Sequence, residues 1–188
     1  WMISGDIELT TKPTWADEWI EPGVYAGNVS REQVAIIKDV QTSGTAAQNI
    51  SASTWTPVRL NTTVNSSSPI TSLSSNRITL LEAGTYEVDA AVNFELPTAT
   101  LWYAKTRLRN ITSGTTLSLG SNARISGVTT AYVIPFTSRI LDTFTISAPT
   151  VIELQAWATF TVNLGYPASS GENEVFSQIK IRKLNGVQ

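Results

Sequence analysis

The chain has 188 residues, and none of them is histidine or cysteine. This composition excludes histidine-dependent catalytic triads, thiol chemistry and disulfides, and it removes the usual zinc ligands. The formal net charge of −2 offers no broad basic surface for phosphates, so we expect no nucleic-acid partner.

The length fits one β-rich domain that can bury a hydrophobic core of its own without covalent cross-links. No apolar run approaches the about 20 residues of a membrane-spanning helix, so we expect no membrane insertion. Charged residues make up 15% of the chain, whereas about 25% is usual in soluble domains. The resulting surface of neutral hydroxyls and amides is typical of extracellular and virion β-proteins.

Residues 1–32 differ from the rest of the chain, because large aromatic residues lie among prolines and acidic residues without sustained periodicity. We interpret this segment as an extended N-terminal arm that precedes a β-sandwich domain at 33–188. The aromatic residues Trp15, Trp19 and Tyr25 either pack against their own subunit as a strap or anchor the chain to a neighbouring protein. Trp and Tyr suit the second role, since both are favoured at interfaces.

From Gln33 onward, short strand signals alternate with turn clusters, and no segment has the pattern of an amphipathic helix. Thr112, Ser113 and Gly114 predict a hairpin connection. About ten strands at regular spacing indicate a sandwich or barrel of antiparallel sheets. The predicted strands cover 34–40, 55–61, 76–81, 85–96, 101–111, 115–119, 129–138, 143–147, 151–162 and 174–184.

The segment from Ile78 to Phe94 contains the clearest strand, which follows Gly84 and has a period of two. Its polar face runs from Glu87 to Asn93. Such a strand is half buried, with one face toward a core. The apolar face consists of Tyr86, Val88, Ala90, Val92 and Phe94.

Two later strands carry information about burial. In 174–184 apolar positions alternate with Gln178, Lys180 and Arg182, so we expect this strand to have one buried face and one solvent-exposed face. In 151–162 the second face still holds Val151 and Trp157, so we expect that strand to be covered by the core on one side and by a partner on the other.

Two carboxylate pairs are candidates for general acid and base in glycoside hydrolysis, namely Glu87 with Asp89 and Glu172 with Glu174. Solvated strand faces and loops have the same composition, and we favour that interpretation for both pairs. The loop 171–174 has the oxygen donors that calcium prefers, yet too few acids in register for a recognised calcium loop. We therefore expect no catalytic residues, no metal and no cofactor.

The order of strand signals from Val34 to Leu184 resembles the C1q/TNF-like superfamily, and in particular the trimeric jelly-roll domains on bacteriophage particles. The similar sequence segments are Ile78–Phe94, Leu-Arg-Asn at 108–110, Phe-Thr-Ile at 144–146, Ile-Glu-Leu-Gln at 152–155 and the last predicted strand at 175–181. The resemblance implies an antiparallel jelly-roll β-sandwich that forms a homotrimer. The chain lacks a collagen-like stalk and carries an unusual arm, so immune signalling is not implied.

The resemblance also implies that large strand residues meet near the threefold axis, although for each single residue we favour a position in the subunit's own core. The trimer-interface candidates are Tyr86, Val88, Phe94, Tyr132, Phe136, Trp157 and Phe176.

From these observations we expect a non-enzymatic viral structural protein, a homotrimeric decoration (cement) protein on the exterior of a bacteriophage virion. Its partners would be itself and viral capsid or tail proteins. The alternative is the receptor-binding head of a tail fibre that recognises a host glycan or protein through Trp102, Tyr103 and Tyr166. A secreted C1q-like ligand and an esterase or lyase acting on host polysaccharide are weaker alternatives.

Overall fold

The computed structural model describes residues 33–65, 69–96, 101–126 and 134–184, which belong to one compact unit, Glu32–Gln188. Every regular element in these ranges is a β-strand, which confirms the prediction of an all-β fold. The predicted arm at 1–32, with Trp15, Trp19 and Tyr25, lies outside the described residues, as does Tyr132.

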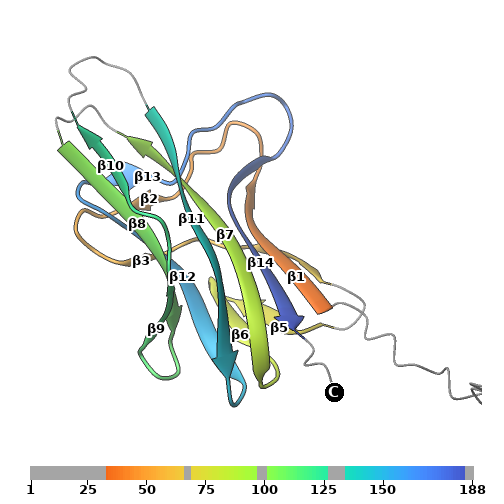
Figure 1. The fold of residues 1–188 in the computed structure, drawn as a ribbon. Helices are drawn as coiled ribbons and strands as arrows, with labels where there is room; N and C mark the ends of the chain where they lie inside the picture. Colours follow the sequence, from red (N-terminus) through yellow and green to blue (C-terminus); the bar gives the residue numbers. More distant parts are fainter. Residues whose placement is uncertain (1–32, 66–68, 97–100, 127–133, 185–188) are drawn as a thin grey trace, which may run out of the picture. The chain divides into compact units, whose positions relative to one another are not determined.

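The strands form two antiparallel sheets (Figure 1). Sheet A follows the order β4-β1-β14-β7-β11, and two short strands, β2 and β13, continue it at the end of β7. Its strands are β1 (Gln33–Gln41), β2 (Asn49–Ile50), β4 (Thr62–Asn65), β7 (Gly84–Leu96), β11 (Ile134–Ile146), β13 (Val162–Asn163) and β14 (Glu174–Leu184).

Sheet B follows the order β5-β6-β12-β8. Strands β9 and β10 pair one after the other with the free edge of β8, and β3 pairs with the edge of β12. Its strands are β3 (Thr56–Pro57), β5 (Thr71–Ser74), β6 (Arg77–Leu80), β8 (Leu101–Asn110), β9 (Thr116–Leu119), β10 (Ala123–Ser126) and β12 (Thr150–Ala158).

Strand β7 is the centre of sheet A. All 13 of its residues pair with β11, from Gly84 opposite Ile146 to Leu96 opposite Ile134. On its other edge, Thr85–Val92 pairs with β14. The period-two prediction is confirmed, because the five apolar residues from Tyr86 to Phe94 are at most 1% exposed.

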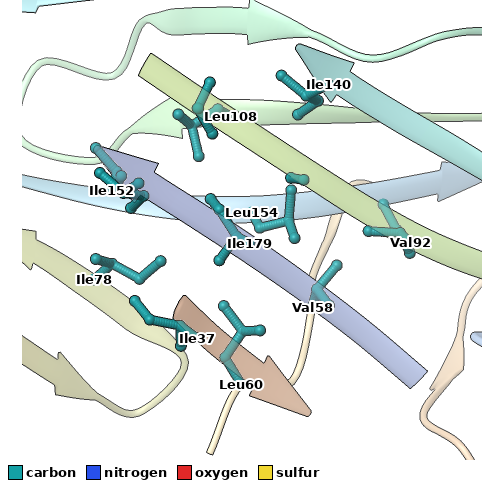
Figure 2. Packing of buried hydrophobic residues seen from close by; sticks show 14 of the residues in the cluster. Ile37, Val58, Leu60, Ile78, Val92, Leu108, Ile140, Ile152, Leu154 and Ile179 are labelled. Carbon is teal, nitrogen blue, oxygen red and sulfur yellow. The ribbon is translucent and has the colours of Figure 1, made fainter. Parts of the chain in front are cut away.

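The core lies between the inner faces of the two sheets. Figure 2 shows aliphatic side chains from both sheets meeting in this space. Each such side chain contributes about 1.5–3 kcal/mol when fully buried. Sheet A supplies Ile37, Val92, Ile140 and Ile179, sheet B supplies Ile78, Leu108, Ile152 and Leu154, and the segment between β3 and β4 adds Val58 and Leu60.

The predicted hairpin after β8 is confirmed. Strand β8 pairs with β9, and the amide of Gly114 donates to the carbonyl of Asn110 at 2.9 Å. Gly114 has a φ of +73°, in the left-handed region, and glycine adopts this conformation without a steric cost.

Two strand predictions differ from the structure. The separate strands expected at 129–138 and 143–147 are replaced by the continuous β11, since Asp142 sits at the open sandwich edge and accepts a hydrogen bond from the Ser118 hydroxyl of β9 at 2.7 Å. The strand expected at 55–61 is only Thr56–Pro57. Beyond Pro57, some backbone amides bond to side-chain oxygens and not to a neighbouring strand. For example, the side-chain oxygen of Gln48 accepts a hydrogen bond from the Arg59 amide at 2.6 Å.

A buried polar contact joins the two sheets beside β8 and β11. The hydroxyls of Thr106 and Ser138 are 2.8 Å apart, and Ser138 also donates to the carbonyl of Ser121 at 2.7 Å. Gly120 lies against this pair. A Cβ atom at Gly120 would stand 2.1 Å from Thr106 Oγ1 and 2.9 Å from Ser138 Oγ, so no side chain fits there.

We therefore expect Gly120→Ala to lower the free energy of unfolding by about 1–3 kcal/mol, the usual cost of overpacking. Urea unfolding followed by tryptophan fluorescence measures this change. The exposed neighbour Asn122→Ala serves as the control and should shift stability by less than about 0.5 kcal/mol. Equal unfolding midpoints for the two variants would show that the space beside Thr106 is not tightly filled.

Candidate functional site

Metal-binding side chains do not cluster in the described residues. No group of three or more histidine, cysteine, aspartate or glutamate side chains gathers there to hold a metal ion. Nor does this part of the chain include a helix long and apolar enough to cross a membrane. The candidate functional sites are consequently surfaces of the sandwich.

The carboxylates of Glu87 and Asp89 lie on the outer face of β7 and are paired with cations. Arg139 donates to both oxygens of Asp89, at 2.9 and 2.7 Å, and Arg182 binds Glu87. The hydrogen bond from Arg139 lowers the pKa of Asp89 below its usual range. A carboxylate held ionised in this way is a poor proton donor near neutral pH, so this pair does not suit acid–base chemistry.

The carboxylate of Glu174 holds two loops together. It accepts backbone hydrogen bonds from Ser169 at 2.8 Å, Ala168 at 3.1 Å and Gly44 at 3.3 Å. These bonds, with that of Ser169 foremost, lower the pKa of Glu174. Both oxygens therefore have a structural role, while Glu172 is exposed on the loop.

Most of the trimer-interface candidates in the described ranges belong to the subunit's own core. Tyr86, Val88 and Phe94 are fully buried within the single chain, and Phe176 is 3% exposed. They leave almost no area for a partner, because the inner face of β7 packs entirely against the core. Phe136 and Trp157 keep partial exposure, Phe136 at the edge strand β11 and Trp157 on the outer face of sheet B.

The three residues expected to contact a glycan do not form one site. Trp102 is 1% exposed and packs edge-on against Phe94 with the ring centroids 6.1 Å apart, so it cannot stack on a sugar. Tyr166 is 72% exposed and lines a hollow with Phe176. Tyr103 is 39% exposed and lines a different hollow on sheet B.

The outer face of sheet B carries a group of aromatic and basic side chains, which we call the basic aromatic face. Lys105 Nζ lies 5.5 Å from the ring centre of Trp55 and 5.6 Å from that of Trp157. The guanidinium of Arg107 lies 4.1 Å from the ring centre of Trp55. Distances of this size are favourable for cation–π attraction. The members of the face are Trp55, Tyr103, Lys105, Arg107, Arg124 and Trp157.

Sequence reasoning missed this face, although β8 carried a signal for it. Tyr103, Lys105, Arg107 and Arg109 alternate with the inward residues of β8, so one side of the strand is aromatic and basic throughout.

On the second side of β12, Val151 and Trp157 stay half-buried, while the polar residues between them are covered by the chain's own side chains. Glu153 is 5% exposed and accepts hydrogen bonds from Arg77 at 2.8 Å and from Gln155 at 2.7 Å. Arg107 in turn donates to Gln155 at 2.8 Å. These contacts bury the polar outer residues of β12 without a partner.

On the outer face of sheet A, apolar side chains lie among charged ones, and its apolar members are Ile36, Val64, Ala91 and Leu141. Leu141, Ile36 and Val64 share one cross-strand row with Asp89 and Lys180. Leu141 is 69% exposed and Val64 57% exposed. A shallow hollow of about 430 Å³ on this face is lined by Ile36, Asp89, Ala91, Thr137, Arg139, Gln178 and Lys180.

The pairing of Asp89 with Arg139 predicts a pH dependence. Because the pKa of Asp89 is lowered on folding, its stabilising contribution is present above about pH 4, its usual range, and is lost as the pH falls through the lowered value. Arg139→Gln should raise the pKa of Asp89, measured by NMR titration. The difference in unfolding free energy between this variant and the parent protein should become smaller as the pH falls. Arg109→Gln, on the other sheet, should leave this pKa unchanged; an unaltered pKa in Arg139→Gln would contradict the assignment.

No protein-family model matches the sequence, and no curated protein matches it. Solved structures are similar in fold. Eiger TNF from S. frugiperda aligns with a TM-score of 0.53 and 13% identity over 84% of this chain and 95% of that chain. Murine APRIL at pH 8.5 aligns with a TM-score of 0.52 and 13% identity over 82% of this chain and 100% of that chain. Murine APRIL at pH 5.0 gives a TM-score of 0.51, 12% identity and the same coverage.

At these identities the likeness concerns the fold and not the function. The strand order of both sheets and the similarity to the TNF and APRIL structures establish the architecture. The described domain is a TNF-like jelly-roll β-sandwich.

Proposed function

We propose that this chain is a non-enzymatic structural protein of a bacteriophage, a homotrimeric decoration protein on the outside of the virion. The observation that carries the proposal is the outer face of sheet A, which presents exposed Leu141 and Val64 while Glu87 and Asp89 on the same face are already paired with arginines. Apolar side chains exposed in this way favour a protein–protein contact. The low charge content of the chain supports an extracellular, particle-bound location.

Self-association through this face is consistent with its electrostatics. Asp89 and Glu87 are neutralised by Arg139 and Arg182 within the chain, so covering them does not leave an unpaired acid. A contact between copies would also remove Leu141 from water, which favours association by about 25 cal/mol for each Å² of apolar surface.

Decoration requires no reaction. A trimer that bridges several capsid subunits lowers the free energy of the assembled shell by mass action, and three linked contacts multiply the avidity of one. In this proposal the arm at 1–32 grips the shell through Trp15, Trp19 and Tyr25, while the jelly roll forms the exposed body.

A charge at Leu141, on the outer face of sheet A, should disrupt the proposed trimer. We expect Leu141→Glu to shift the protein from three chains to one at micromolar concentration, measured by sedimentation velocity. Leu119→Glu is the matched control, because Leu119 is 68% exposed on β9 of sheet B. It should leave the mass unchanged. Equal masses for the two variants would place the interface elsewhere.

Removing the aromatic residues of the arm should separate capsid binding from assembly. We expect the full chain with Trp15→Ala, Trp19→Ala and Tyr25→Ala to form the same oligomer but to bind shells stripped of the protein at least tenfold more weakly. Cosedimentation with shells measures this affinity. Undiminished binding by the triple variant would contradict the role of the arm as an anchor.

A receptor-binding head of a tail fibre is the second candidate, and the basic aromatic face favours it. Tyr103 and Trp157 line one hollow on an outer sheet face, where exposed rings suit a host ligand. Binding of the labelled protein to host cells distinguishes the two functions. A decoration protein binds capsids and ignores cells, whereas a receptor-binding head does the reverse.

A further inference from the structure

The basic aromatic face contains a small hollow that is built from three neighbouring segments. Its volume is about 310 Å³, at the lower end of the about 300–1,000 Å³ usual for ligand pockets. Two cross-strand pairs set its sides, since Tyr103 lies opposite Arg124 and Lys105 lies opposite Trp157. The full lining consists of Tyr103, Ala104, Lys105, Asn122, Arg124 and Trp157.

The charge of this hollow is uncompensated. Its lining includes two cations and no carboxylate. Within the described ranges, neither Lys105 nor Arg124 forms an ion pair. Many other cations of the domain do have a carboxylate partner, namely Arg59, Arg77, Arg139, Arg182 and Lys183.

The surroundings add to the positive field. Arg107 and Arg109 follow Lys105 on the same outward side of β8. Burial, together with repulsion from Arg109, lowers the pKa of Arg107. Lys105 Nζ meanwhile lies within cation–π distance of the rings of both Trp55 and Trp157, which positions its ammonium group at the hollow.

The chemistry of the lining selects one kind of ligand. Rings such as Tyr103 and Trp157 present flat apolar surfaces, on which the C–H face of a pyranose can stack. Lys105 and Arg124 supply charge-assisted hydrogen bonds to a carboxylate. The Asn122 amide can both donate to and accept from sugar hydroxyls. A ring that is apolar on its face, anionic at one position and hydroxylated elsewhere satisfies all three requirements.

A nucleic acid fits this surface less well. The chain carries a net charge of −2, and a backbone of regularly spaced phosphates needs a long basic track, not two cations in a hollow of this size.

We propose that the hollow between Tyr103 and Trp157 is a binding site for a carboxylated sugar, such as a uronic acid residue of a surface polysaccharide. Stacking on the two rings orients the pyranose, and Lys105 and Arg124 bind its carboxylate. This site is independent of capsid decoration, and it names the ligand class for the receptor-binding alternative.

The test is an NMR titration of the isotope-labelled full chain with D-glucuronate and, separately, with D-glucose. We expect glucuronate to bind at least tenfold more tightly than glucose and to shift the indole N–H signals of Trp55 and Trp157. Arg124→Gln and Tyr103→Ala should each weaken glucuronate binding at least tenfold. The matched control is Arg109→Gln, which removes the same charge from the same sheet face outside the hollow and should change the affinity less than twofold.

Several outcomes would overturn the proposal. Equal affinity for glucose and glucuronate would remove the role of the cations, and equal shifts with sodium acetate would remove the role of the sugar ring. Equal losses in Arg109→Gln and Arg124→Gln would mean diffuse charge attraction. Tighter binding of an acidic peptide or of a short single-stranded DNA would assign the hollow to a macromolecule. None of these results bears on capsid binding, so the decoration proposal stands or fails separately.

Discussion

The pairing of β7 on both edges is the interaction on which the rest of the domain depends. Its 13 residues bond to β11 along one edge, and eight of its positions, Thr85–Val92, bond to β14 along the other. This pairing fixes which side chains face the core. It directs Tyr86, Val88 and Phe94 inward, where they are fully buried, and leaves Glu87 and Asp89 on the outer surface.

Because the inner faces of both sheets pack into the core, the surfaces available for binding are the outer faces. The outer faces of sheets A and B differ in character. On sheet A, Glu87 and Asp89 are paired with arginines within the chain, and Leu141 and Val64 remain exposed, as in a contact between proteins. On sheet B, Lys105 and Arg124 lack acidic partners and lie beside aromatic rings, as in a site for an anionic ligand. One sandwich can therefore associate with its own copies and still present a ligand site.

The sequence predicted those parts of the fold that depend on local pattern. Strands β7 and β14 each match their predicted ranges to within one residue, because the period of two runs through β7 and, from Ser177 onward, through most of β14. Short strands such as β2 and β10 were missed, since two to four residues carry too little periodicity. Strand β11 was predicted as two strands, at 129–138 and 143–147, whereas in the structure Asp142 lies within one continuous strand and accepts a hydrogen bond from Ser118 across the sandwich edge.

The candidate sites were less predictable, because they depend on which strands lie side by side. Periodicity shows that Trp102 and Tyr103 point in opposite directions, but it does not show which of them faces the core. Lys105 meets Trp55 and Trp157 only through the pairing of β12 with both β8 and β3, and these residues are far apart in the sequence.

The central claim is that a TNF-like sandwich with an apolar outer sheet face assembles with its own copies. The molar mass of the full chain in solution, measured by light scattering at micromolar concentration, tests this claim most directly. We predict a mass near three times 20.4 kDa. A mass of one chain under these conditions would contradict the account, since the exposed side chains of sheet A would then have no role in self-association.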